Sequence, residues 1–209
     1  MPQITGVRER RGRARVFVDG EFWAEIDANV ALERGLYEGA ALSCDELDEA
    51  RVAGEKALAM SRALNFLAYR SRSEKEVRDR LFRYGYGAET VDGVLERLAE
   101  LGYLDDEGFA RTAAREKSRK YGPRRVSADL MRGGVSGEIA RAAVEEAFAE
   151  HSEREMAREL AARRYNKSER SDAQARRVYG FLVRRGFSAD VCAGIAREYR
   201  GPDASEADV

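Results

Sequence analysis

Polar and apolar residues alternate near the start of the chain. Residues 13–18 show this alternation, residues 21–26 are rich in apolar residues and can return as the partner strand, and Asp19-Gly20 stands between them. A period of two indicates strands, and Asp-Gly is typical of a two-residue hairpin turn. The pattern therefore predicts a β-hairpin. Two strands alone are only marginally stable in water, so we expect the hairpin to pack on a helix beginning near Asp27 and on Leu32, Leu36 and Leu42.

From Ser43 onward the apolar spacing is helical. Ser43 and Ser73 are each followed three positions later by Glu, which is the pattern of a capping box at the start of a helix. The first of these helices is expected to be long, unless Gly54 breaks it. Apolar residues over 91–101 mark one face of a further helix. Gly102 is well placed to end that helix in a left-handed conformation.

An internal repeat organises the helical part. Gly85, Gly134 and Gly186 are each the fifth residue of a hexapeptide that begins with Leu and ends with an apolar residue, and they lie 49 and 52 residues apart. Each copy indicates a helix, a glycine turn and a second helix, with one more helix upstream. The apolar residues after the glycines are expected in the core, and serines are expected to cap the second helix of the last two copies: Tyr86, Val135 and Phe187; Ser136 and Ser188.

The pattern as a whole predicts a mainly α fold of tandem three-helix modules, preceded by a small N-terminal hairpin and helix. We place the hairpin and helix region at 1–55. The modules are expected at 56–104, 105–151 and 152–200, and residues 201–209 as a disordered tail. Stacked modules of this kind bury a continuous core and offer an extended surface to a long partner.

Charge narrows the class of partner. Charged residues make up 36 % of the 209 residues and hydrophobic residues 44 %, so the chain is expected to fold. The net charge of −1 conceals segregation, because residues 1–55 hold 7 Lys and Arg against 12 Asp and Glu, whereas residues 151–200 hold 12 against 7. Residues 111–125 hold seven basic residues and one acid. Such segregation indicates a polyanion or an acidic protein groove as partner.

Basic residues recur at one structural position in all three modules, which predicts a shared binding stripe. Arginine forks bind phosphate or carboxylate, although a solvated charged face remains the alternative. Reversing Arg124 and Arg125 to Glu is expected to weaken binding and barely to change folding. The candidate binding residues are Arg70, Arg72, Lys75, Arg115, Lys117, Arg119, Lys120, Arg124, Arg125, Arg163, Arg164, Lys167 and Arg170.

The residues indicate no catalytic set and no cofactor. The acids at 105–107 suggest a magnesium site, but adjacent acids at a helix start are ordinary capping chemistry. His151, the sole histidine, is expected in a linker, and no glycine-rich loop matches a phosphate-binding fingerprint. Cys44 and Cys192 are far apart and are expected to be buried, which fits a reducing cytoplasm. No segment has the length and apolarity of a membrane helix or signal peptide.

Four segments, in order and at matching spacing, resemble the RecX family of RecA regulators. They are ALNFLAYRSRSEKEV at 63–77, LAELGYLDDEGFA at 98–110, YGPRRV at 121–126 and LVRRGFS at 182–188. The resemblance implies a monomer that binds the RecA filament on single-stranded DNA and modulates, in the direction of inhibition, its recombinase, ATPase and co-protease activities in DNA repair and the SOS response. Members also bind single- or double-stranded DNA. The alternative is a stand-alone helical DNA-binding protein that uses the arginine-rich stripe.

Overall fold

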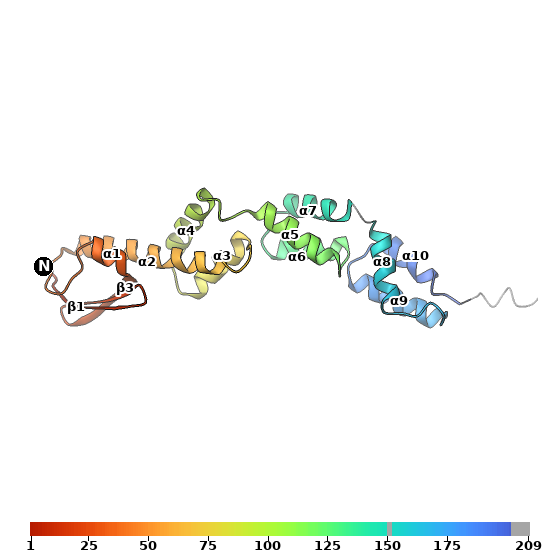
Figure 1. Cartoon of the computed structure of the whole chain (residues 1–209), viewed down its shortest axis with the longest axis horizontal. Helices are drawn as coiled ribbons and strands as arrows, with labels where there is room; N and C mark the ends of the chain where they lie inside the picture. Colours follow the sequence, from red (N-terminus) through yellow and green to blue (C-terminus); the bar gives the residue numbers. More distant parts are fainter. Residues whose placement is uncertain (150–151, 202–209) are drawn as a thin grey trace, which may run out of the picture. The chain divides into compact units, whose positions relative to one another are not determined.

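The chain forms two compact units, Met1–Asp105 and a second that begins at Asp106. A computed structural model describes residues 1–149 and 152–201 (Figure 1). His151 and residues 202–209, most of the predicted tail, lie outside the described residues. The boundaries of the five segments proposed from the sequence stay predictions.

The N-terminal strands form a three-stranded antiparallel sheet in the order β1-β2-β3, where β1 is Ile4–Arg10, β2 is Arg13–Val18 and β3 is Glu21–Asp27. The turn at Asp19-Gly20 is confirmed, with both residues at positive φ. The hairpin prediction missed β1, whose exposed, charged residues hide its alternation. The sequence pattern also does not predict the β1–β2 turn. Arg11 adopts a positive φ of 53° there, which is uncommon for a residue other than glycine.

One face of the sheet is covered by helices α1 (Ala28–Glu33) and α2 (Cys44–Leu67) (Figure 1). Asp27 caps α1 by accepting hydrogen bonds from the N–H groups of Asn29 and Val30. The core beneath the helices contains Val16, Ile26 and Leu36, among others. Of the three leucines expected there, Leu32 is wrongly predicted, because it lies 82 % exposed on the short helix α1.

Helix α2 is continuous through Gly54 and joins two cores. A Cβ atom at Gly54 would stand 2.4 Å from the Cβ atom of Ile26, so the glycine lets the helix approach β3 closely rather than breaking it. The first half of α2 adds Leu47 and Ala50 to the core of the sheet. Its second half adds Ala59 and Ala63 to the core that it shares with α3 (Glu74–Arg83) and α4 (Ala88–Glu100). The second half of α2 and these two helices form the first helical triplet.

The second unit contains two further helical triplets. The second triplet is α5 (Asp106–Ser118), α6 (Pro123–Arg132) and α7 (Gly137–Ala149), and the third is α8 (Glu153–Ala162), α9 (Asp172–Arg184) and α10 (Ala189–Arg197). Each triplet buries its own apolar core. Val135 and Phe187 are buried as expected, and Tyr86 is half-buried against the core of the first triplet.

The repeated glycine turn has the same geometry in all three triplets. Gly85, Gly134 and Gly186 have φ values of 90°, 96° and 84°. Each donates its N–H to the carbonyl three residues back at 2.9–3.0 Å, and the residue after each donates to the carbonyl five residues back at 3.2–3.4 Å. These are the two hydrogen bonds of a Schellman motif, which favours glycine at its left-handed position. The predicted repeat is therefore confirmed down to its hydrogen bonds.

The predicted caps are confirmed with one exception. Ser43 and Ser73 form complete capping boxes, and the Ser136 hydroxyl accepts a hydrogen bond from the Ile139 N–H at 3.3 Å. Ser188 stands at the N-cap position of α10, but its side chain makes no capping hydrogen bond. Its hydroxyl donates instead to the Glu153 carboxylate at 3.0 Å, and the same carboxylate also accepts the Ser188 N–H.

Both cysteines are free, and they lie in different environments. Cys192 is buried in the core of the third triplet, and burial raises the pKa of its thiol. Cys44 is exposed at the first position of α2, so the expectation that it would be buried is wrong. The first residue of α2 that joins the core is Leu47, three positions later.

Candidate binding surface

The three basic clusters predicted from the sequence all lie where the first helix of a triplet connects to the second. Arg70 and Arg72 follow α2, Arg119 and Lys120 follow α5, and Arg163 begins the connection after α8. The neighbouring candidates lie on the ends of the flanking helices or further along the same connections. The sequence thus located equivalent positions correctly, and the ion pairs at those positions distinguish one candidate from another.

In the first triplet the candidate cations are engaged by the protein itself. The Arg70 guanidinium donates two hydrogen bonds to the Glu76 carboxylate, at 2.7 and 3.1 Å. The Arg72 side chain is only 17 % exposed and lies over the ring of Phe66 at 4.1 Å. Lys75 forms an ion pair with Asp79 on the next turn of α3, at 2.6 Å. These three residues therefore contribute to packing and helix capping, and little free charge remains.

In the second triplet a nearly buried carboxylate gathers three cations. Asp129, whose side chain is 10 % exposed, lies 2.8 Å from the Lys117 ammonium, 2.7 Å from Arg132 and 3.4 Å from Arg125. Burial raises the pKa of Asp129, but hydrogen bonds from Lys117 and Arg132 outweigh it, so its pKa lies below the ordinary value. Arg115 is also paired, with Glu146 on α7 at 2.7 Å.

Glu198 has a similar role in the third triplet. Its carboxylate accepts hydrogen bonds from Arg158 at 2.6 Å and from the Lys167 ammonium at 2.9 Å. The Arg158 hydrogen bond is the main reason why the pKa of Glu198 is lowered. Arg163 pairs with Glu159 one turn earlier, at 3.3 Å. Exposed pairs of this kind contribute little to stability, but they reduce the free positive charge.

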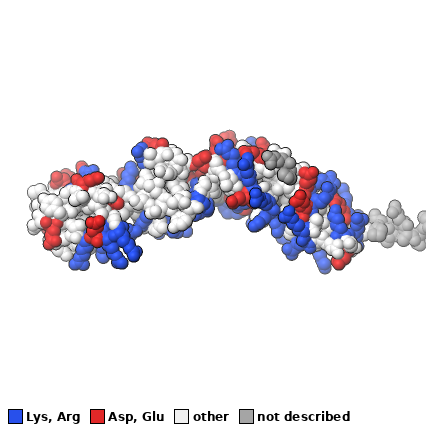
Figure 2. All heavy atoms as spheres, viewed as in Figure 1, with Lys and Arg blue, Asp and Glu red and all other residues white. Residues whose placement is uncertain are grey.

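Five of the predicted residues form no ion pair with a carboxylate within residues 1–149 and 152–201. They share exposed positions in the two connections of the second unit or at the start of α6, and we call them the unpaired cations: Arg119, Lys120, Arg124, Arg164 and Arg170. Figure 2 shows Lys and Arg atoms prominent over this unit, with Asp and Glu atoms between them.

The second and third triplets meet where their turns contact each other through two glycines. The Gly122 N–H donates to the Arg185 carbonyl at 2.8 Å, and the Arg124 N–H donates to the Gly186 carbonyl at 3.2 Å. A Cβ atom at Gly122 would stand 2.6 Å from the backbone of Gly186, and one at Gly186 would stand 2.4 Å from the Cβ atom of Arg125. Only glycine allows this approach at either position. We call this contact the glycine joint.

The glycine joint assembles a cationic and aromatic cluster, which we call the joint surface. The Arg185 side chain donates to the Lys120 carbonyl at 2.5 Å. The guanidinium groups of Arg125 and Arg185 lie 5.3 and 5.7 Å from the centre of the Tyr121 ring, close enough for cation–π attraction. The joint surface comprises Lys120, Tyr121, Arg124, Arg125 and Arg185.

Sequence reasoning missed Arg185 as a surface residue. The LVRRGF segment indicated a repeat and a family resemblance but no binding residue, although two consecutive arginines before its glycine were the available signal. The structure also separates two residues that were treated as equivalent. Arg124 is among the unpaired cations, whereas Arg125 packs on Gly186, stacks on Tyr121 and pairs with Asp129. Reversing Arg125 is therefore expected to disturb folding as well as charge.

A groove of about 710 Å³ also lies between the second and third triplets. Arg115 and Arg119 line it from the second triplet and Arg163 from the third, so the structure brings these three predicted residues together. Its apolar lining includes Met156 and Leu160.

Over the described part of the chain, no group of three His, Cys, Asp or Glu side chains is placed to hold a metal ion. No helix there has the length and apolarity to cross a membrane.

The fold defines a class of protein: a tandem array of three-helix domains, here with exposed, unpaired cations on the second unit. Comparison with known families gives the particular family. Models of the first, second and third three-helix domains of RecX match residues 59–98, 105–144 and 152–193. The chain belongs to the RecX family.

Relatives and solved structures agree with this assignment. Regulatory protein RecX of Listeria innocua is 30 % identical over 193 residues, which cover 90 % of this chain and 71 % of the relative. That of Lactobacillus johnsonii is 34 % identical over 143 residues, 66 % of this chain and 53 % of the relative. A crystal structure of regulatory protein RecX aligns with a TM-score of 0.65 at 23 % identity and covers 94 % of this chain and all of that one. RecX from Lactobacillus salivarius aligns with a TM-score of 0.59 at 25 % identity, over 70 % of this chain and 97 % of that one.

Proposed function

We propose that this chain regulates RecA by binding the RecA filament on single-stranded DNA and lowering its recombinase, ATPase and co-protease activities. The process served is DNA repair and the SOS response. Membership of the RecX family, whose curated relatives are named regulatory proteins, supports a regulatory role. RecA as the partner, and inhibition as the direction of the effect, are what the resemblance to the RecX family implies.

The observation that carries the proposal is the joint surface of the second unit. Lys120 and Arg124 are exposed there without a carboxylate partner among the described residues, while the glycine joint fixes the backbone that carries them. Because the backbone is already ordered, binding costs less backbone entropy there than it would at a mobile loop, which favours association with an anionic partner. A filament with phosphates and acidic side chains supplies such charges.

The test is RecA's rate of ATP hydrolysis on single-stranded DNA, with the chain added at concentrations too low to coat the DNA. The wild-type chain is expected to lower the rate, and the double variant Lys120→Glu, Arg124→Glu to do so much less. The matched control is Arg51→Glu, Arg97→Glu, which changes the net charge equally in the first unit. A wild-type chain without effect would contradict the proposed function. If the Lys120→Glu, Arg124→Glu variant inhibits RecA as strongly as the wild type does, the proposed surface is wrong.

A stand-alone DNA-binding protein is the second candidate. The arginines on either side of the Tyr121 ring favour it, because guanidinium groups and aromatic rings together also suit DNA. A direct DNA binder loses affinity steeply with salt, in proportion to the number of phosphates that it neutralises. Strong inhibition of RecA at salt concentrations where bare single- or double-stranded DNA is not bound would exclude this candidate.

We further propose that the protein is a cytoplasmic monomer without enzymatic activity or cofactor. The names of the relatives support a regulatory rather than catalytic role, and each triplet buries its apolar core within the chain. Sedimentation equilibrium is expected to give a single species of 23.4 kDa. A nuclease activity that requires Mg²⁺ and is lost when the acids at 105–107 are replaced would contradict the non-enzymatic assignment.

A further inference from the structure

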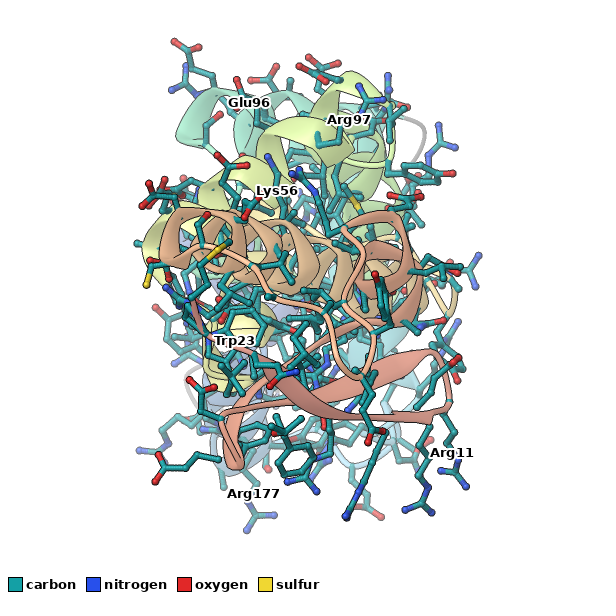
Figure 3. The ribbon with its side chains drawn as sticks, turned by 90° about the vertical axis from the view of Figure 1, so that its left-hand side faces the viewer. Arg11, Trp23, Lys56, Glu96, Arg97 and Arg177 are labelled. Carbon is teal, nitrogen blue, oxygen red and sulfur yellow. The ribbon has the colours of Figure 1, made fainter. Side chains whose placement is uncertain are left out.

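One face of the N-terminal sheet is turned away from the helices and carries aromatic rings and arginines. Strand alternation places Ala14 and Val16 in the core, and Trp23 also packs there. Figure 3 shows Trp23 between the sheet and the helical layer, whereas Arg11 points away from both. Phe22 is 52 % exposed, although it is a large hydrophobic residue. None of these residues belongs to the joint surface, so the proposed RecA-binding site gives this face no role.

Two rings and two guanidinium groups form a connected set on the outer face. Phe17 on β2 and Phe22 on β3 are cross-strand partners with ring centres 6.0 Å apart. The Arg8 guanidinium lies 5.3 Å from the centre of the Phe17 ring, and that of Arg15 lies 5.0 Å from the centre of Phe22. Both guanidinium groups therefore lie over ring faces, and the two rings meet edge to face at 73°, so the set is rich in π-systems without being flat.

The charge on this face is unfavourable for the sheet alone. Arg8 and Arg15 are directly opposite each other, as are Arg10 and Arg13, and like charges at such positions destabilise a sheet. Two of the acids on β3 are already engaged, since Glu25 pairs with Arg13 at 3.2 Å and Asp27 caps α1. Four arginines lack a carboxylate partner within the described residues: Arg8, Arg10, Arg11 and Arg15. An anionic ligand would relieve this repulsion.

We propose that this outer face binds single-stranded nucleic acid. Unpaired bases stack on aromatic rings and guanidinium planes, and open antiparallel sheets with exposed aromatic residues hold two or three bases in this way. The neighbouring arginines would neutralise phosphates along the strand. A duplex keeps its bases stacked inside, so the exposed rings favour the single-stranded form. The proposal is independent of the proposed RecA regulation, because the face lies on the first unit and uses none of the joint surface.

The experiment measures fluorescence anisotropy of a labelled oligothymidylate titrated with the full chain, without RecA. Phe22→Ala is expected to weaken binding by between about 5- and 150-fold, the range for losing one stacked base, and Phe22→Tyr to restore it. Arg8→Gln, Arg15→Gln is expected to reduce the slope of log affinity against log salt by about 1.4, at about 0.7 for each phosphate contact. The control Arg51→Gln, Arg97→Gln removes equal charge from the same unit and is expected to keep the wild-type slope.

Two further controls separate binding from folding. Tyr69→Ala removes an aromatic side chain that is 87 % exposed in the same unit and should leave the affinity unchanged. Trp23 is the single tryptophan and packs against the core of the sheet, so its emission spectrum reports whether each variant retains that core. A parallel titration with oligouridylate distinguishes a DNA site from an RNA site, and tight binding of either supports the proposal.

Two results would overturn the proposal. The first is wild-type affinity and salt slope for both the Phe22→Ala and the double-arginine variants. The second is oligonucleotide binding that survives these changes but is lost in Lys120→Glu, Arg124→Glu, which would place the nucleic-acid site in the second unit. Neither result bears on inhibition of RecA, which is measured separately.

Discussion

The glycine joint makes a quantitative prediction about Gly186. Replacement by Ala introduces a Cβ atom 2.4 Å from the Cβ atom and 2.5 Å from the backbone nitrogen of Arg125. Backbone atoms cannot move aside as a flexible side chain can, so the joint must open. Opening removes the two backbone hydrogen bonds of Gly122 and Arg124 and the one from Arg185 to the Lys120 carbonyl.

The repeat supplies a matched control at Gly85. It occupies the equivalent turn at φ 90°, and a Cβ atom there would meet nothing within 4 Å. Gly85→Ala therefore carries only the cost of a left-handed alanine, about 1–2 kcal/mol. Gly186→Ala carries that cost and also loses three hydrogen bonds at about 1 kcal/mol each. We expect it to destabilise its unit by about 2–4 kcal/mol more than Gly85→Ala destabilises the first.

The assay is urea denaturation followed by far-ultraviolet circular dichroism, together with amide hydrogen exchange of peptides around residues 120–126. These peptides contain the N–H groups of Gly122 and Arg124, and they are expected to exchange faster in Gly186→Ala but not in Gly85→Ala. Equal destabilisation by the two variants, with unchanged exchange at 120–126, would refute the reasoning that the joint holds the two triplets together.

Three further predictions concern individual side chains. Asp129→Asn is expected to lower the unfolding free energy of the second unit by about 1–3 kcal/mol, because its charge-assisted hydrogen bonds are weakened; an unchanged urea midpoint would contradict this. Because the pKa of Asp129 is lowered in the folded state, its contribution is complete above the unfolded value of about 3.9 and is lost as pH falls through the folded pKa. Acid unfolding of Asp129→Asn should therefore depend less steeply on pH than that of the wild type. With a disulfide reagent, exposed Cys44 is expected to react at once and buried Cys192 only when the third triplet opens; two rapidly reacting thiols would contradict its burial.

Features fixed by a few neighbouring residues could be predicted from the sequence. A Schellman turn needs a left-handed glycine within one helix end, so Gly85, Gly134 and Gly186 were recognisable from spacing alone. The capping boxes at Ser43 and Ser73 are equally local. The three-helix repeat follows from these signals, and its confirmation rests on hydrogen bonds within each triplet.

Features that depend on contacts between distant residues were not predictable. Strand β1 carries little alternation and is defined by its pairing with β2. The Ser188 hydroxyl was expected to cap α10, but a carboxylate 35 positions earlier takes it. The same limit applies to the binding stripe: its basic residues were visible, but Lys117 on α5 pairs with Asp129 on α6, and Lys167 pairs with Glu198, 31 positions later.

The central claim is that the joint surface of the second unit contacts the RecA filament. Hydrogen exchange of the chain, free and with RecA assembled on single-stranded DNA, tests it most directly. We predict that peptides covering residues 117–126 and 182–188 exchange more slowly in the chain bound to the filament than in the free chain. A further sample with RecA but no DNA is expected to lack this protection, and so is the Lys120→Glu, Arg124→Glu variant with the filament. A filament that binds the chain while these peptides exchange as in the free protein would contradict the claim.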